Sequence, residues 1–247
     1  MKLAILSDIH SNLEALQSCL AHAEAQGAEQ FAFLGDLVGY GADPLACLDI
    51  IEALAQQGAV VVKGNHDEAV VTGLCEQMSF TARDAIYWTQ TQIRQKERAF
   101  LQNLPMAVKN GDTLYVHASA DKPECWNYIT GVRDAARSME AAGTPFTFVG
   151  HVHHQVLYHA ANNEVPRAFL PTPGMPIPVF PHRQLLAIVG SVGQPRDGSN
   201  AAAYVILDRK QNTLTFFRVP YDYITAEKKV LAAGLPYRHV LTLKSGD

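Results

Sequence analysis

Lys2-Leu3-Ala4-Ile5-Leu6-Ser7-Asp8-Ile9-His10 is the stretch that decides the fold. Its apolar part, up to Leu6, predicts a short buried strand that stops at a carboxylate. Side chains alternate along a strand with a period of two, so Asp8 and His10 are expected on the same side. Two groups that can bind a metal ion therefore leave the strand together, and we interpret them as half of a metal site.

The same arrangement, an apolar strand followed by polar residues, recurs twice in the next 60 residues. Residues 31–34 run into Gly35-Asp36, and residues 59–62 run into Gly64-Asn65-His66-Asp67. Helices are predicted in between, over residues 12–26, where leucines recur at spacings of three and four, and from residue 43 to about 58, where Asp43-Pro44 is a helix start and apolar residues recur every three positions. Parallel strands end at one edge of a sheet, so the three polar clusters are expected to converge there.

The rest of the chain continues this pattern and then becomes rich in strands. The expected elements are a mostly helical region at 79–104, a strand at 113–116 before His117, a helix at about 132–142, and a strand at 146–149 before Gly150-His151-Val152-His153. Helices become scarce after residue 153, where strands are expected at 156–159, 185–189, 203–207 and 214–219, with a turn at 210–212 and an irregular proline-rich loop at 171–181. We therefore expect an α/β fold of two packed sheets with helices outside, forming one domain over residues 1–247.

Composition limits the possible partners and compartments. The 247 residues are 48% hydrophobic and 18% charged, with a net charge of -4, so no basic field predicts a nucleic-acid or membrane partner. No apolar run approaches the roughly 20 residues that span a bilayer. The four cysteines form no C-x-x-C pair and the first residues lack the features of a secretion signal, which predicts a cytoplasmic protein with reduced thiols.

Metal-binding side chains gather where the predicted strands end. The candidates are Asp8, His10, Asp36, Asn65, His66, His117, His151 and His153. A single aspartate at a strand end is more often a cap, but so many buried polar groups without an ion would be costly. Nitrogen and oxygen donors without a thiolate favour Mn, Fe, Zn, Co or Ni, and their number suits two divalent ions about 3.5–4 Å apart.

The five polar clusters at the strand ends resemble, in order, the five motifs of the calcineurin-like metallophosphoesterases. They are Asp8-Ile9-His10, Gly35-Asp36, Gly64-Asn65-His66-Asp67, His117 and Gly150-His151-Val152-His153. Asp8-Ile9-His10-Ser11-Asn12 and the loop Gly190-Ser191-Val192-Gly193-Gln194-Pro195-Arg196 resemble in particular a small bacterial phosphodiesterase and phosphatase branch. The resemblance implies a four-layer αββα sandwich of two mixed β-sheets flanked by helices. It also implies a single calcineurin-like phosphoesterase domain.

The resemblance implies a role for each candidate residue. Asp8, His10 and His153 would hold one ion, Asn65, His117 and His151 the other, and Asp36 would bridge them. A metal-bridging hydroxide would attack phosphorus in line. The catalytic residues would be His66, which protonates the leaving oxygen or binds the transition state, and Asn65, which also reaches a phosphoryl oxygen.

Two residues are expected on the substrate side, Asn12 and Arg196. The loop at 190–196 has two interpretations, a cradle in which backbone amides and Arg196 hold a phosphate, or a tight turn with a surface arginine. Where the protein Ser/Thr phosphatases have the aspartate that orients the catalytic histidine and a phosphate-binding arginine, this chain has Gly39 and Tyr40. That departure argues against this subclass and leaves the orienting partner of His66 open.

The predicted function is hydrolysis of phosphodiester or phosphomonoester bonds in a small phosphorylated substrate. Two alternatives remain, a dinucleoside polyphosphate hydrolase and a non-catalytic scaffold of the same fold. The unbroken ligand set and His66 favour an enzyme over the scaffold.

Overall fold

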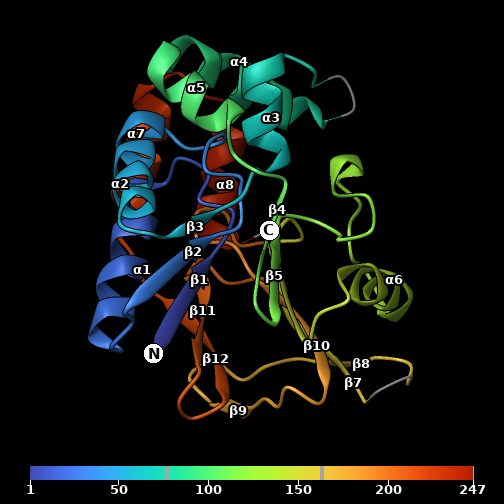
Figure 1. Ribbon diagram of the computed structural model, residues 1–247. Helices are drawn as coiled ribbons and strands as arrows, with labels where there is room; N and C mark the ends of the chain where they lie inside the picture. The colour runs from blue at the N-terminus through green and yellow to red at the C-terminus, as the bar shows by residue number, and fades with distance from the viewer. Residues whose placement is uncertain (76–77, 162–163, 247) are drawn as a thin grey trace.

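Two mixed six-stranded β-sheets pack face to face, with helices on their outer faces (Figure 1). The computed structural model describes residues 1–75, 78–161 and 164–246. Helices α1 (Leu13–Ala25) and α2 (Pro44–Gln56) cover the first sheet, and α6 (Val132–Ala142) covers the second. The predicted four-layer αββα sandwich is confirmed, whereas the extent of the domain, residues 1–247, stays a prediction.

The first sheet joins the N-terminal βα repeats to strands from the end of the chain. Its order is β3 (Val60–Val61), β2 (Gln30–Phe33), β1 (Lys2–Leu6), β11 (Ala202–Asp208), β12 (Thr213–Val219) and β9 (Ile177–Pro178). Strands β1, β2 and β3 are parallel, whereas β11, β12 and β9 pair antiparallel. The short β9 lies within the loop that was predicted to be irregular throughout, because its backbone completes the edge beside β12.

The second sheet is also mixed. Its order is β4 (Ala107–Asn110), β5 (Thr113–Val116), β6 (Phe146–Val149), β10 (Gln184–Val189), β7 (Gln155–Ala160) and β8 (Arg167–Phe169). Strands β5, β6 and β10 are parallel, and antiparallel strands flank them on both sides. The carboxyl ends of β5 and β6 therefore lie together, as do those of β1 and β2 in the first sheet.

Strand β1 is buried on both faces, which explains its unbroken apolar sequence. Leu3 and Ile5 point into the core between the sheets, and Ala4 and Leu6 pack in the core that the helices cover. At roughly 25 cal/mol per Å² of apolar area, the larger side chains, Leu3, Ile5 and Leu6, contribute about 1.5–3 kcal/mol each when they leave water. Burial thus holds the strand end that carries Asp8 and His10.

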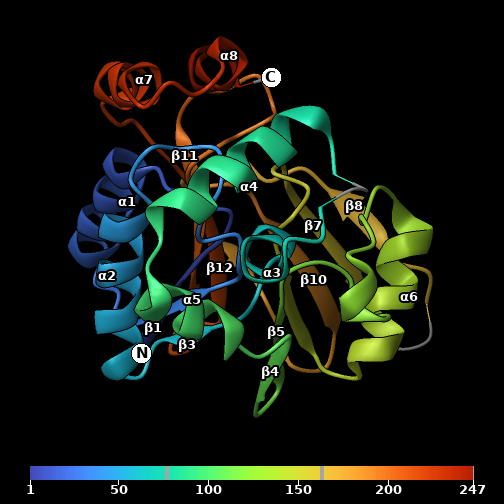
Figure 2. The same ribbon diagram turned by 90° about the horizontal axis from the view of Figure 1, so that it is seen from above.

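Helices also lie above the strand ends, as Figure 2 shows from that side. Helices α4 (Phe80–Gln92) and α5 (Gln95–Gln102) confirm the helical region predicted at 79–104, and α3 (Asn65–Thr72) starts directly after β3. A 3₁₀ turn, η1 (Pro123–Cys125), precedes α6. None of the helices in the described ranges combines the length and the apolarity needed to cross a membrane.

The chain ends in two helices, although no helix was predicted beyond residue 142. These are α7 (Tyr223–Ala232) and α8 (Tyr237–Ser245), which bury Ala226, Val230 and Leu243 in a small core of their own. The Asp222 side chain caps α7 by accepting a hydrogen bond from the Thr225 amide at 3.0 Å. This start signal was present in the sequence. The apolar residues of α7 are divided between buried positions, Ala226 and Val230, and exposed ones, Ile224 and Leu231, so its sequence shows no single apolar face.

Candidate metal centre

Five strand ends bring the predicted ligands together. Asp8 follows β1, Asp36 follows β2, Asn65 follows β3, His117 follows β5, and His151 and His153 follow β6. The residues that follow the strands of the first sheet contact those that follow the strands of the second. Asp8 Oδ2 accepts a hydrogen bond from the His151 amide at 3.0 Å. All seven predicted ligands thus lie in one place, as their positions after parallel strands led us to expect.

The backbone turns sharply at these ligands. Asp8, His10, Asp36, His151 and His153 have φ between 49° and 65°, the left-handed region, which costs a residue with a side chain roughly 1–2 kcal/mol. Such strain persists where the surroundings hold the backbone in place, and it is common at functional sites. Here the His10 amide donates to Asp36 O at 3.0 Å and the Asp8 amide to Gly35 O at 3.1 Å.

Asp67 ties two of these turns to each other. Its buried carboxylate accepts hydrogen bonds from the amides of Leu37 and Gly64 at 2.9 Å each, and from Val38 at 3.3 Å. A Cβ on Gly64 would overlap the backbone nitrogen and Oδ1 of Asp36, so only glycine allows this approach. No role was predicted for Asp67, and the structure identifies it as the residue that holds the Asp36 turn against α3.

The first group of donors consists of Asp8, His10 and His153. His153 Nε2 lies 3.1 Å from Asp8 Oδ1 and 3.2 Å from His10 Nε2. Asp8 Oδ1 is buried and makes no hydrogen bond with the described residues. Three buried donor atoms therefore point at one small volume.

The second group consists of Asp36, His117 and His151, with Asn65 beside them. His117 Nε2 lies 3.5 Å from Asp36 Oδ2, 3.2 Å from His151 Nδ1 and 3.1 Å from Asn65 Oδ1. Asp36 Oδ2 is also 3.7 Å from His10 Nε2 of the first group. Asp36 therefore lies between the two groups, as a bridging ligand must.

Three of the histidine rings are held in the tautomer that a metal ion needs. The Nδ1 atoms of His10, His117 and His153 face the carbonyl oxygens of Val38, Leu34 and Gln194 at 3.2, 2.6 and 2.6 Å. A carbonyl only accepts, so Nδ1 carries the proton and Nε2 presents its lone pair to the site. Lone pairs directed at each other and at carboxylates in a buried site require a cation between them, so the donors present fit divalent metal ions.

The charge states of the donors also suit cations. Burial raises the pKa of Asp8 and Asp36, but the neighbouring histidines, His153 for Asp8 and His117 for Asp36, outweigh it and hold both below the usual range. Burial lowers the pKa of His10 well below its usual value and that of His151 to about 3. Burial opposes protonation of His117 too, yet Asp36 raises its pKa to about 9. Positive charge is thus favoured beside Asp36.

His66 borders both groups from the first turn of α3, and with His10 and Asp36 it forms a third set of donor atoms that lie close together. Its Nε2 lies 4.0 Å from Asp36 Oδ2, and its ring centre is 4.8 Å from that of His10 and 4.7 Å from that of Tyr40. Its Nδ1 is buried and has no hydrogen-bond partner among the described residues. Burial lowers the pKa of His66 to about 4. In place of an orienting carboxylate, His66 is held by ring packing against Tyr40 and by the α-carbon of Gly39, beside which Nδ1 lies.

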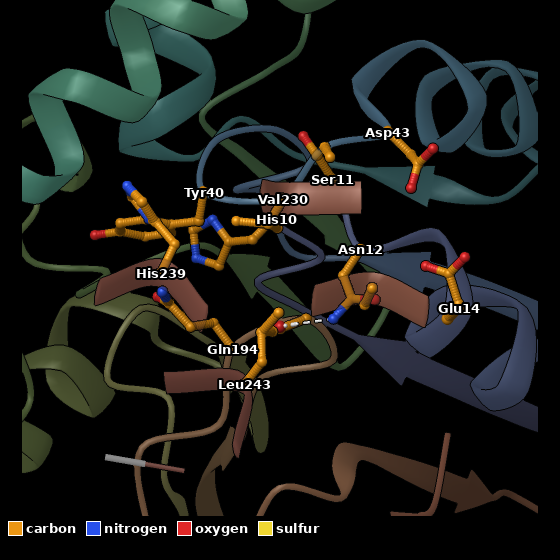
Figure 3. A pocket seen from close by; sticks show the side chains of 14 residues that line it. His10, Ser11, Asn12, Glu14, Tyr40, Asp43, Gln194, Val230, His239 and Leu243 are labelled. Atoms are coloured by element: carbon orange, nitrogen blue, oxygen red, sulfur yellow. Dashed lines mark hydrogen bonds between the residues drawn. The ribbon is translucent and has the colours of Figure 1, made fainter. Parts of the chain in front are cut away.

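The two residues predicted on the substrate side lie in different surroundings. Asn12 is buried: its Oδ1 caps α1 by accepting from the Ala15 amide at 3.2 Å, and its Nδ2 donates to Gly193 O at 3.0 Å (Figure 3). A direct contact between Asn12 and a substrate stays a prediction. Arg196 faces the cleft beside the metal centre and donates to Gln194 Oε1 at 2.7 Å and to the Tyr40 hydroxyl at 3.3 Å.

Three aromatic residues near the site were not predicted. His239 of α8 is buried beside Tyr40, with ring centres 5.6 Å apart, and Figure 3 shows it at the pocket that also contains His10. Trp126 and Tyr128 line the cleft between α3 and the η1 turn. They follow no strand and match no motif, so no spacing in the sequence connects them with the metal centre.

Comparisons with known proteins agree with this geometry. Residues 1–212 match the model of the calcineurin-like phosphoesterase superfamily domain. The Methanocaldococcus jannaschii protein MJ0912 is 34% identical over 239 residues, which are 95% of this chain and 93% of that protein. A symmetrical bis(5'-nucleosyl)-tetraphosphatase from Glaesserella parasuis is 30% identical over 143 residues, 56% of this chain and 50% of that protein.

A solved structure extends the similarity over the whole chain. The crystal structure of a metallophosphoesterase from Sphaerobacter thermophilus has a TM-score of 0.88 and 34% identity, and the match covers 100% of this chain and 99% of that one. Sequence and fold thus lead to one assignment. This chain belongs to the calcineurin-like phosphoesterase superfamily.

Proposed function

We propose that this chain hydrolyses phosphate esters with the help of two divalent metal ions. The observation that supports this most is the position of Asp36, whose Oδ2 is 3.7 Å from His10 Nε2 and 3.5 Å from His117 Nε2. Asp8, His10 and His153 would hold one ion and Asn65, His117 and His151 the other, with Asp36 bridging. The donor chemistry suits Mn, Fe, Zn, Co or Ni.

The chemistry is shared between the ions and the chain. When bound, two such ions supply an activated water molecule as nucleophile and positive charge for the phosphoryl oxygens. His66 faces this region through Nε2 and would donate a proton or hydrogen bond to the leaving oxygen. The Asn65 amide would bind a phosphoryl oxygen. Arg196 would bind a further negative charge of the substrate, and Asn12 would hold the loop that carries Arg196 through its bond to Gly193.

A second candidate is hydrolysis of a dinucleoside polyphosphate. It is favoured by the similarity to the Glaesserella parasuis tetraphosphatase, which covers 56% of this chain. The same donors would serve that reaction, because it too breaks a bond between phosphorus and oxygen. A scaffold without catalysis is disfavoured because no member of the donor set is replaced.

We also propose that the protein works in the cytoplasm on a small phosphorylated substrate. Cys19, Cys47, Cys75 and Cys125 are all free, which suits a reducing compartment.

The test is turnover by the Mn-loaded protein of p-nitrophenyl phosphate, bis(p-nitrophenyl) phosphate and diadenosine tetraphosphate. His66→Ala should keep its metal content and lose roughly 10²- to 10⁴-fold in kcat, as expected when a general acid is removed. The exposed His182 provides the control, because His182→Ala should leave kcat unchanged. Turnover of none of the three substrates would refute the proposal and favour the scaffold.

A further inference from the structure

A cleft of about 650 Å³ opens beside the metal centre. Helix α3 and the residues after it form one wall, and the η1 turn with Trp126 and Tyr128 forms the other; Figure 1 shows this turn rising beside α3. Pockets of this size hold whole organic molecules. The cleft therefore has room for much more than the phosphoryl group that reacts at the metals.

Two aromatic rings lie against ligands of the second ion. The Tyr128 ring stacks on His151, with centres 4.0 Å apart and planes at 23°, and Trp126 contacts His117 edge to face, with centres 5.9 Å apart. Tyr128 is nevertheless 54% exposed, so much of it remains available to a ligand. An aromatic surface thus begins directly beside the metal centre.

The backbone holds this surface in a costly conformation. The η1 turn lies between Lys122 and Trp126, with φ of 56° and 53°, both in the left-handed region. That region is rare for a bulky residue and costs roughly 1–2 kcal/mol at each position. Strain of this kind is concentrated at sites that bind ligands.

The rest of the cleft complements a flat ring joined to an anion. The opposite wall contributes apolar side chains, among them Met78 and Leu74, of which Leu74 is 72% exposed. The Arg196 guanidinium also lines the cleft, 5.7 Å from the centre of the Tyr40 ring. The cleft has a mixed polar and apolar lining, with a stacking surface at one side and a cation near the metal centre, which suits a base, a sugar and a phosphate in sequence.

We propose that Trp126 and Tyr128 form a stacking surface for the base of a nucleotide, so that the substrates are nucleotides or nucleoside phosphate esters. That these nucleotides are hydrolysed rests on the proposed function, but the binding of the base does not. The base would lie on Tyr128 and Trp126 while its phosphate reaches Arg196 and the metal centre.

Fluorescence can detect the contact without turnover. The chain has two tryptophans, so Trp88→Phe leaves Trp126 as the emitter. Trp88 lies outside the cleft, beside the small core of α7 and α8. Adenosine, which has no phosphate to hydrolyse, should quench this emission saturably, and ribose should not. Absence of saturable quenching by adenosine up to its solubility would overturn the proposal.

Substitutions assign the contact to the rings. Tyr128→Ala should weaken adenosine binding in calorimetry roughly 5- to 150-fold, the effect of losing one base–aromatic stack, while inorganic phosphate binds within twofold of its original affinity. Tyr128→Phe should restore binding. Tyr237→Ala is the matched control, because Tyr237 is 56% exposed but lies on α8. Unchanged adenosine binding in Tyr128→Ala and in folded Trp126→Ala would refute the assignment.

The two proposals fail in different ways. Adenosine binding without hydrolysis of any phosphate ester would refute the proposed function and leave the stacking surface intact. Hydrolysis of nitrophenyl esters without adenosine binding would refute the stacking surface alone.

Discussion

Gly39→Ala should displace His66 and lower turnover while the metal ligands stay in place. A Cβ built on Gly39 would lie 2.4 Å from His66 Nδ1, whereas ordinary van der Waals contact begins at 3.4 Å. The imidazole must therefore move by about 1 Å, and a displacement of about 1 Å can cost roughly 100-fold in rate. We expect kcat for bis(p-nitrophenyl) phosphate with added Mn to fall about 100-fold.

Gly58→Ala separates this displacement from backbone strain. Gly39 and Gly58 have φ of 94° and 99°, so a side chain costs each roughly 1–2 kcal/mol of unfolding free energy. Nothing lies within 4 Å of a Cβ on Gly58. Urea unfolding should show a loss in both variants, and kcat should change less than twofold in Gly58→Ala.

The comparison has a clear negative outcome. If folded Gly39→Ala keeps two bound ions and the kcat of Gly58→Ala, then His66 does not act from its position beside Gly39. The packing account of how His66 is oriented would then be wrong.

Three further predictions concern stability, thiol chemistry and metal content. Burial, followed by the charge of Arg238, lowers the pKa of His239 to about 4, so the native ring stays neutral while the unfolded chain binds a proton below about pH 6.5. The stability that the buried neutral His239 ring contributes is therefore present above pH 6.5 and is lost as pH falls towards 4. From pH 7 to pH 5, the wild type should lose about 2 kcal/mol more unfolding free energy than His239→Leu, and equal losses would contradict the assignment. Cys125 is exposed and the other three thiols are buried, so a thiol reagent should label one cysteine quickly in the native protein and none in Cys125→Ser. Fast labelling in that variant would place another thiol at the surface. Asp36→Asn should retain one ion or none by elemental analysis, because the bridge loses its charge; two retained ions would contradict bridging by Asp36.

Much of the metal centre could be predicted because its determinants are local. The apolar run before Asp8 and the β-branched run before Asn65 each indicate a buried strand and the place where it ends. Parallel strands end at one edge, so the ligand types collect there without knowledge of any distance. The orientation of His66 could not be predicted, because Gly39 and Tyr40 act on it only through packing.

The sequence by itself determined the order along the chain of the strands and of the candidate ligands, and it predicted a metal-binding role for the opening Asp8 and His10 pair. Only the tertiary structure decided that Asp36 lies between two donor groups, that α7 and α8 pack into a core of their own, and that Trp126 and Tyr128 stand beside His117 and His151. The physical reason is the range of the interactions. Strand periodicity and side-chain chemistry are set by near neighbours, whereas the walls of the cleft come from segments that meet only when the two sheets pack.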